Sequence, residues 1–291
     1  SRHPGPHRQR RTGRLVSKPA TEEEFSRLCE FLYRRTGMLY GEGKRYYIDR
    51  RVAQRMERAG TPSFAAYMGL LRGSPAEAER LVNSFTVNET YFYREEHQLR
   101  ALSRDILPEI TAARGPGDRV RIWSVPCSTG EEPYSVAIWL LENWPMVDAY
   151  NIEILGSDID TDALAAAAEG VYAGRALSRL PPDLLDRYFE APRDGTRRII
   201  ADLRESVRLT AANLVDAAGM AAEGRFDVIL CRNVLIYFDE ASRAEAARNL
   251  HAALAPGGFL LLGHTEAMGR IADGFTTRRF EGAVVHQRPQ S

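Results

Sequence analysis

Polar side chains stand where two apolar segments of this 291-residue chain end. Arg232 and Asn233 close the segment Phe226–Asn233, and Asp158 lies near the end of Ile152–Ile159. Both segments have the length and apolar content of buried strands. Because the carboxyl ends of parallel strands meet at one edge of a sheet, we expect these side chains to face a bound nucleotide there.

A short acidic segment follows the first predicted strand, Arg119–Cys127. Gly130 permits a tight turn, Pro133 suits the first turn of a helix, and Glu131 and Glu132 lie between them. The single glycine excludes the G-x-G-x-x-G fingerprint of dinucleotide-binding proteins. Carboxylates at a helix start repel a pyrophosphate and attract a cationic ligand group, although Glu131 could equally complement the helix dipole. Spacing alone does not choose between the two glutamates.

Asp158 has the position where an adenosine ribose would present its hydroxyl groups, whereas Asp160 has the position of a helix cap. An acid for the ribose, an acidic helix start and no phosphate loop together suggest S-adenosylmethionine. This cofactor carries a positive ammonium and a positive sulfonium, and it has no phosphate. The histidines and cysteines lack the spacing of a metal site, so no metal is expected.

The elements that must position these residues alternate between strand and helix from residue 119 onward, which predicts a parallel, doubly wound α/β sheet. Two late runs separated by Glu281-Gly282 fit a hairpin at the sheet edge. Residues 172–206 break the alternation with a hairpin turn at Asp194-Gly195, and we interpret them as an inserted β-subdomain rather than a long crossover. The predicted strands are Arg119–Cys127, Ile152–Ile159, Val207–Leu214, Phe226–Asn233, Gly258–His264, Thr276–Arg279 and Ala283–Gln287, and the helices between them are Glu131–Glu142, Thr161–Glu169 and Asp239–Leu254.

The first third of the chain is helical after a basic start. Residues 1–20 are rich in Arg, Pro, Gly and His without apolar periodicity, so we expect a disordered tail. A capping box at Thr21 and Glu24 opens an all-helical N-terminal domain over residues 21–84. A connector over 85–97 leads into the domain of residues 98–291, which begins with a long amphipathic helix ending near Ile110. The later helices predicted for the N-terminal domain are Tyr46–Ala59, Ser63–Arg72 and Pro75–Asn83.

Composition limits the partners and the location. Lys and Arg balance Asp and Glu over the chain, 39 against 39, but residues 1–90 hold 17 basic and 10 acidic residues. A basic front half suggests an acidic partner, and the simpler alternative is a solvated charged surface. The neutral total argues against nucleic acid. Three distant cysteines, no long apolar run and no signal peptide predict a cytoplasmic protein that does not insert into membranes, and we expect a monomer.

Five motifs occur in the order typical of one family. They are NETYFYRE at 88–95, STGEEPYS at 128–135, GSDID at 156–160, RNVLIYFD at 232–239 and GHTE at 263–266. Together they resemble the chemotaxis receptor methyltransferases, the CheR family, over nearly all of residues 20–288. The resemblance implies a class I (Rossmann-like) methyltransferase domain with an inserted small β-subdomain, preceded by a small all-helical domain.

The resemblance also implies a reaction and a set of site residues. The reaction is the methylation of glutamate side chains on the cytoplasmic helical bundle of chemoreceptors (methyl-accepting chemotaxis proteins), which leaves S-adenosylhomocysteine as product. Glu132 would bind the methionine ammonium, Asp158 the ribose, and Tyr237 would sit near the methyl group. The implied cofactor-binding residues are Asn88, Thr90, Arg94, Glu132, Asp158, Asn213, Leu214, Asn233 and Val234.

Two residues are predicted to be catalytic, Arg94 and Tyr237. A glutamate carboxylate is ionised at pH 7 and is itself the nucleophile, so no general base is needed. Arg94 could hold one carboxylate oxygen and leave the other free to attack, while Tyr237 could orient the substrate and offer its ring to the sulfonium. From the residues alone, Arg94 could instead pair with Glu95 or Glu96 at the surface, and Tyr237 could be a core aromatic.

Arg51, Arg55 and Arg58 recur at i, i+4 and i+7 on the second helix, and we predict that they dock an acidic receptor bundle. The alternative is a solvated helix face. Some family members also bind a receptor C-terminal peptide at the edge of the β-subdomain, but the segment before Asp194-Gly195 is short beside that pattern, which argues against such a tether. Two other functions stay open: a methyltransferase with another acceptor, and a non-catalytic cofactor-sensing scaffold.

Overall fold

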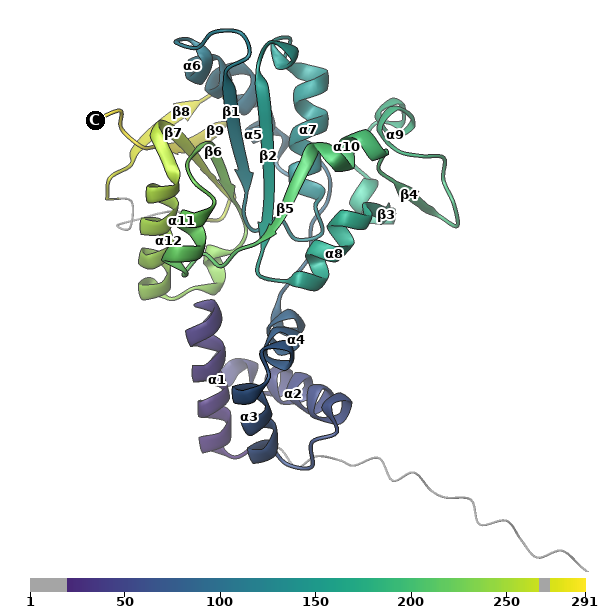
Figure 1. Cartoon of the computed structure of the whole chain (residues 1–291), viewed down its shortest axis with the longest axis vertical. Coiled ribbons are helices and arrows are strands. Elements are labelled where there is room, and N and C mark those ends of the chain that lie inside the picture. The colour runs from purple at the N-terminus through teal and green to yellow at the C-terminus, as the bar shows by residue number, and fades with distance from the viewer. Residues whose placement is uncertain (1–19, 267–272) are drawn as a thin grey trace, which may run out of the picture.

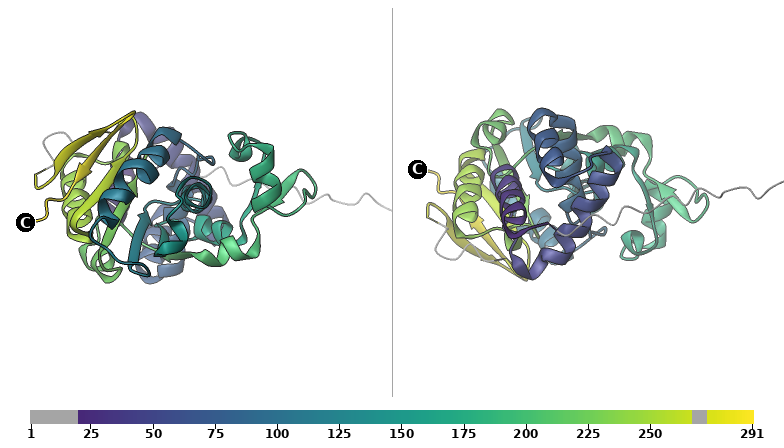
Figure 2. Two further views of the ribbon diagram at one scale, coloured as in Figure 1. Left: turned by 90° about the horizontal axis from the view of Figure 1, so that it is seen from above. Right: turned by 90° about the horizontal axis from the view of Figure 1, so that it is seen from below.

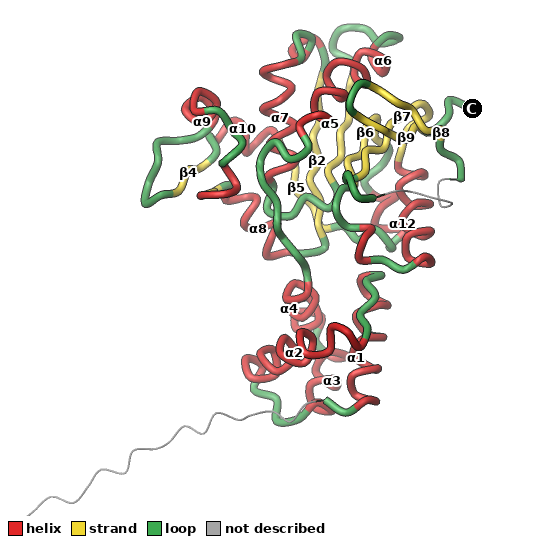
Figure 3. The backbone as a smooth tube through the Cα atoms, turned by 180° about the vertical axis from the view of Figure 1, so that it is seen from behind, coloured by secondary structure: helices red, strands yellow, loops and turns green. Residues whose placement is uncertain are grey.

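The computed structural model describes residues 20–266 and 273–291 (Figure 1). The tail predicted over residues 1–20 lies outside the described residues except for Ala20. A small helical domain stands against one edge of a larger α/β domain, and one segment of chain passes between them (Figures 1 and 3). That edge is the one at which the parallel strands end, so the two domains meet where the sequence predicts the nucleotide.

Four helices form the helical domain, as predicted. The first begins at the predicted capping box, in which the Glu24 amide donates to the Thr21 hydroxyl at 3.2 Å and the Thr21 amide donates to the Glu24 carboxylate at 2.9 Å. It ends at Gly37, whose φ of 73° is the left-handed conformation that glycine adopts without strain. The helices are α1 (Glu22–Thr36), α2 (Arg45–Ala59), α3 (Phe64–Gly73) and α4 (Pro75–Phe85), with the short turn η1 (Glu42–Lys44) before α2.

Seven strands form the central sheet, and the predicted mostly parallel α/β fold is confirmed. The strand order is β5-β2-β1-β6-β7-β9-β8. The first five run parallel, and β9 and β8 return as the predicted antiparallel hairpin at the edge. The order reverses between β1 and β6, which is where ligands bind in such sheets. The strands are β1 (Arg119–Ser124), β2 (Asn151–Asp158), β5 (Val207–Ala211), β6 (Phe226–Cys231), β7 (Leu254–Leu262), β8 (Thr276–Phe280) and β9 (Ala283–Gln287).

Helices cover both faces of this sheet (Figure 2). Alternate strand residues point to opposite faces, so Ile122 and Val228 join the apolar cluster that contains α7, whereas Trp123 and Ile229 join the one that contains α12. Burial on both faces explains the nearly continuous apolar runs of the strands. The helices are α7 (Glu131–Asn143), α8 (Thr161–Glu169), α10 (Ala201–Ser206), α11 (Ala217–Ala222) and α12 (Glu240–Ala253). Within residues 20–266 and 273–291, no helix is both long and apolar enough to span a membrane.

The helix after the connector is interrupted, where the sequence predicts one continuous helix ending near Ile110. The helices α5 (Glu96–Ala101) and α6 (Leu107–Thr111) flank a π-type turn over Leu102–Ile106. Pro108 accounts for the widened turn, because proline lacks an amide hydrogen and its ring crowds the carbonyl four residues earlier. The interruption lies downstream of the connector.

The insertion is a small β unit, as predicted, and it has one strand pairing more than the predicted hairpin. The predicted turn at Asp194-Gly195 is present, with φ angles of 50° and 74°. The residues before the turn bridge those after it, as predicted, through Arg193 with Thr196 and Phe189 with Ile199. The strand after the turn, β4 (Thr196–Arg198), also pairs with β3 (Val171–Ala173), which the sequence did not predict. The helix α9 (Pro182–Tyr188) fills the space between the two strands in the sequence. The partner strand is distant in sequence, so a local turn signal could not identify it.

Two sets of contacts join the helical domain to the α/β domain. On one side, the Tyr33 hydroxyl donates to Asp239 at 3.0 Å, and the Asn213 side chain donates to the carbonyl of Arg35 at 2.6 Å. On the other side, the Asn83 side chain donates to the hydroxyl of Thr161, at the start of α8, at 2.9 Å. The pocket described next lies between these two sets.

Candidate active site

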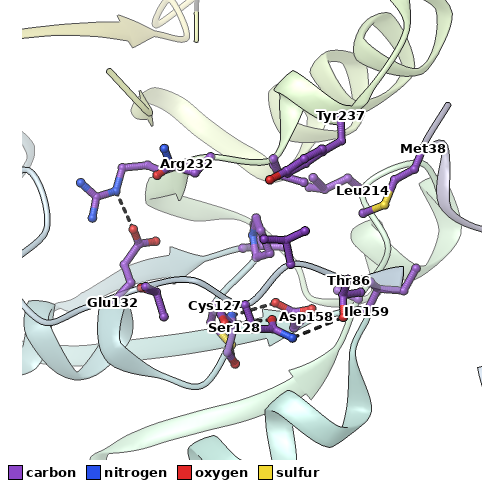
Figure 4. A pocket seen from close by; sticks show the side chains of 18 of the residues that line it. Met38, Thr86, Cys127, Ser128, Glu132, Asp158, Ile159, Leu214, Arg232 and Tyr237 are labelled. Atoms are coloured by element: carbon purple, nitrogen blue, oxygen red, sulfur yellow. Dashed lines mark hydrogen bonds and ion pairs between the residues drawn. The ribbon is translucent and has the colours of Figure 1, made fainter. Parts of the chain in front are cut away.

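One pocket opens at the carboxyl edge of the sheet, between the two domains (Figure 4). It encloses about 860 Å³, counting the part that is open to solvent. The structure brings together in it all ten residues that the sequence assigns to cofactor binding or catalysis. They are Asn88, Thr90, Arg94, Glu132, Asp158, Asn213, Leu214, Asn233, Val234 and Tyr237.

The two glutamates at the start of α7 have different surroundings. Glu132 lines the pocket, accepts a hydrogen bond from the Ser124 hydroxyl at 2.8 Å and pairs with Arg232. Glu131 does not line the pocket. It is 4% exposed, it accepts a hydrogen bond from Thr129 at 2.6 Å, and burial raises its pKa. Of the two, only Glu132 is placed to meet a cationic ligand group in the pocket.

Asp158 is held at the end of β2 as a hydrogen-bond acceptor. Its two carboxylate oxygens accept the backbone amides of Ser128 at 2.7 Å and Asp160 at 2.9 Å. Burial raises the pKa of Asp158 to about 6, although these hydrogen bonds act to lower it. The remaining lone pairs suit the two hydroxyl donors of a ribose. Asp160 caps α8 as predicted, because its carboxylate accepts the amides of Asp162 and Ala163 at 3.0 Å.

Arg232 forms a buried network that the sequence did not predict. Its side chain is 4% exposed, and its Nε donates to Glu132 at 2.5 Å. Its Nη1 donates to the carbonyl of Arg94 at 2.9 Å and pairs with the Glu95 carboxylate at 3.2 Å. The same nitrogen donates to the side-chain oxygen of Gln98 at 3.4 Å. Figure 4 shows Arg232 and Glu132 pointing toward each other at one end of the pocket. These partners lie 100 or more residues earlier, so only the polar strand end was visible in the sequence.

Glu266 is a second residue to which the sequence assigned no role, although its motif was noted. Its carboxylate accepts four backbone amides, those of Asn233, Val234 and Leu235 at 2.7 Å and that of Gly263 at 2.8 Å. Asn233 has a φ of 62°, a left-handed conformation that persists only where surrounding contacts hold it. Glu266 supplies such contacts and so fixes the pocket wall after β6.

Arg94 lies at the pocket without an ionic partner among the described residues, and Tyr237 lies there with its ring centroid 5.8 Å from Nζ of Lys44. The Arg94 guanidinium donates to the carbonyl of Glu89 at 3.1 Å and lies 5.7 Å from the centroid of the Tyr91 ring. Among the described residues it makes no ion pair, so the surface pair considered as its alternative is not formed. Tyr237 is partly buried against the α12 cluster, and this burial raises its pKa.

The connector is tied to the loops after β1 and β2. Asn88 donates to Asp160 at 2.7 Å and accepts from the Ser128 hydroxyl at 2.9 Å. Thr86 also donates to Asp160. These hydrogen bonds bring the connector to the pocket, where Thr90 also lies on the lining.

Two lining residues lie at and just after the end of α1, in the helical domain, and the sequence did not predict them. Thr36 and Met38 line the pocket, and Met38 forms an antiparallel backbone bridge with Phe238. The Leu39 amide donates to the carbonyl of Tyr237 at 3.3 Å. No sequence pattern indicates this contribution, because it follows from how the two domains pack.

The docking role predicted for Arg55, the middle arginine of the α2 face, is wrong. Arg55 is turned inward, with its side chain 11% exposed, and it binds both carboxylate oxygens of Glu77 at 2.7 and 3.0 Å. The Tyr67 hydroxyl binds the same carboxylate at 2.9 Å. The buried Glu77 requires a positive partner, and Arg55 supplies it. Arg58 is exposed and Arg51 is partly exposed, so only these two remain at the surface.

The donor set of the pocket fits S-adenosylmethionine. The buried group of Glu95, Arg232 and Glu132 contains two carboxylates and one guanidinium, and the negative charge in excess suits the ammonium of the cofactor. Asp158 suits its ribose, and Leu214 offers an apolar wall. In the described part of the chain, no group of three or more His, Cys, Asp or Glu residues could hold a metal ion.

The sequence matches two family models in succession. The model described as CheR methyltransferase, all-alpha domain, matches residues 23–86, and CheR methyltransferase, SAM binding domain, matches residues 88–283. Chemotaxis protein methyltransferase 2 of Vibrio cholerae is 44% identical over 271 residues, covering 92% of this chain and 94% of that protein. Chemotaxis protein methyltransferase 1 of Pseudomonas aeruginosa is 32% identical (92% and 98% covered), and the chemotaxis protein methyltransferase of Escherichia coli is 34% identical (89% and 89%). The chain therefore belongs to the CheR family, and it is a methyltransferase that uses S-adenosylmethionine.

Proposed function

We propose that this protein transfers the methyl group of S-adenosylmethionine to glutamate side chains on the cytoplasmic helical bundle of chemoreceptors, forming methyl esters. The relatives named chemotaxis protein methyltransferases support the setting. The observation that supports this acceptor is that the Arg94 guanidinium has no ion-pair partner among the described residues. Among the described residues, Arg94 and Arg232 are the cations that line the pocket, and only Arg232 is ion-paired. An unpaired guanidinium at the cofactor site suits an anionic acceptor.

A glutamate side chain suits the chemistry of this pocket. Its carboxylate is ionised at pH 7 and attacks without a general base. When bound, the cofactor supplies a methyl group on a positive sulfonium. Opposite charges disappear during the transfer, so excluding water and aligning the reactants favour the reaction. Arg94 holds one carboxylate oxygen and leaves the other free to attack, while Tyr237 orients the acceptor from the pocket wall.

The acceptor helices reach the pocket across the helical domain. Arg51 and Arg58 remain at the surface of α2 and attract the acidic face of the receptor bundle. The short segment around the Asp194-Gly195 turn argues against a second attachment through a receptor C-terminal peptide. The protein acts as a monomer in the cytoplasm, where the receptor bundle lies.

The test uses methyl-labelled S-adenosylmethionine and an isolated chemoreceptor cytoplasmic fragment. We expect base-labile label on receptor glutamates, and its loss with Arg94→Ala even at S-adenosylmethionine concentrations that saturate the variant. The matched control is Arg100→Ala, because Arg100 pairs with Glu96 on the exposed side of α5 and its loss should leave the transfer unchanged. Base-stable label would indicate an amine acceptor instead. Tight cofactor binding without transfer would indicate a sensing scaffold.

A further inference from the structure

We propose that Arg232 is a positioning residue that holds Arg94 over the pocket and links its position to the cofactor site. The inference rests on the proposed function, because it concerns how the acceptor-binding arginine is kept in place. Arg232 itself is occupied by protein groups. Its guanidinium binds Glu132 on one side and the connector on the other.

The connector around Arg94 has an unusual backbone. Tyr93 and Glu95, the residues on either side of Arg94, have φ angles of 59° and 54°. Residues other than glycine keep such left-handed conformations only where surrounding contacts hold them. Arg232 provides two of these contacts, to the carbonyl of Arg94 at 2.9 Å and to the Glu95 carboxylate at 3.2 Å. The amide of His264 donates to the other Glu95 oxygen at 2.6 Å.

Arg232 also reaches the cofactor side of the pocket. Its Nε donates to Glu132 at 2.5 Å, and its side chain is 4% exposed, so water does not weaken these interactions. Glu132 and Glu95 share one guanidinium. A ligand ammonium beside Glu132 supplies the missing positive charge. The interaction of Arg232 with Glu95 and the carbonyl of Arg94 therefore changes in strength when the ligand binds. Lysine cannot replace this arginine, because a single ammonium lacks the planar fork that binds both sides.

The first experiment measures methylation of a chemoreceptor fragment by Arg232→Lys, with S-adenosylhomocysteine affinity determined by calorimetry. We expect kcat to fall about 100-fold, because small displacements of a substrate-orienting group have effects of this size. The decisive measurement is the double variant with Arg94→Lys. If Arg232 acts through Arg94, the double variant is no slower than Arg94→Lys alone. If the kcat losses of the two single variants multiply in the double variant, the proposal is wrong.

Two further variants separate positioning from general stability. Arg121→Lys is the matched control, because Arg121 is also partly buried, pairs with Glu153 and binds the carbonyls of Arg225 and Glu223, but at the opposite edge of the sheet. It should leave kcat unchanged. If Arg232→Lys does not fold, Glu95→Gln removes the connector side of the same ion pair. We expect it to show the same non-additive behaviour with Arg94→Lys, and additive losses there would also count against positioning.

A readout without catalysis keeps this inference distinct from the proposed function. We expect S-adenosylhomocysteine to slow amide hydrogen exchange over residues 89–95 more in the unmodified protein than in Arg232→Lys. If receptor fragments are not methylated but this difference is present, the acceptor assignment fails and the role of Arg232 stands. Equal protection in both proteins would refute the role of Arg232 even where methylation is observed.

Discussion

Individual carboxylates around the pocket are stabilised in different ways. Asp158 is almost fully buried, and this burial raises its pKa to about 6. Glu266 instead accepts four backbone amides, which surround both of its oxygens with donors. Asp158→Asn should therefore change how stability depends on pH, whereas Glu266→Gln should remove hydrogen-bond partners from the backbone.

Asp158 should make the stability of the ligand-free protein depend on pH. Its folded-state pKa lies above that of an unfolded aspartate, so it contributes stability below about pH 4 that is lost as the pH rises through about 6. Relative to Asp158→Asn, the unmodified protein should lose up to about 3 kcal/mol of unfolding free energy between pH 4 and 8. Urea unfolding at several pH values measures this difference. A difference independent of pH would contradict the prediction.

Glu266→Gln should loosen the wall of the pocket. The amide nitrogen of glutamine cannot accept, so two of the four backbone amides lose their partner, at a cost of about 2–4 kcal/mol in stability. Hydrogen exchange of the Asn233–Leu235 amides should speed up, and the affinity for S-adenosylhomocysteine should fall. Unchanged exchange of these amides would show that other contacts hold the loop.

At the scale of elements, the ion pair between α2 and α4 is structural. Arg55→Ala should cost about 3–5 kcal/mol in unfolding free energy, because it leaves the Glu77 carboxylate buried without a positive partner. Arg58→Ala, on the exposed side of the same helix, should change it by about 0.5 kcal/mol or less. Urea unfolding of both variants provides the comparison. Equal small losses would mean that Glu77 is not buried in solution.

The surface arginines of α2 should affect the receptor rather than the fold. Arg58→Glu is expected to raise the KM for a receptor fragment about tenfold at low salt, with kcat nearly unchanged, because it reverses a charge facing an acidic partner. The increase should shrink as salt is added. A KM that does not respond would remove Arg58 from the docking surface.

Most elements of the fold could be predicted because their signals are local. Apolar runs gave the strands, and the capping box gave the start of α1 within one residue. The β3–β4 pairing could not be predicted, since the partner strand lies outside the local turn. The inward turn of Arg55 could not be predicted either, because it depends on Glu77 from another helix. In the pocket, the polar strand ends were predictable, whereas the partners of Arg232 depend on contacts over 100 residues apart.

At the scale of the whole molecule, the pocket connects the stability of the two domains. Thr36 and Met38 of the helical segment line it together with residues of the sheet edge. S-adenosylhomocysteine at 100 times its Kd should stabilise the protein by about 2.7 kcal/mol. Hydrogen exchange should slow over residues 36–40 as well as in the α/β domain. Protection confined to the α/β domain would mean that the helical domain does not take part in binding.

The position of Glu266, after all the residues it binds in chain order, also bears on how the protein is made. The helical domain and β1 are synthesised early. The amides of the loop Asn233–Leu235, however, have their carboxylate acceptor only once Glu266 has been added. Since chains grow from the N-terminus and domains fold as they emerge, the cofactor site is completed on the ribosome only after the helical domain and strands β1 to β7 have been synthesised. A nascent chain that stops before residue 266 should therefore have folded helices but no competent site.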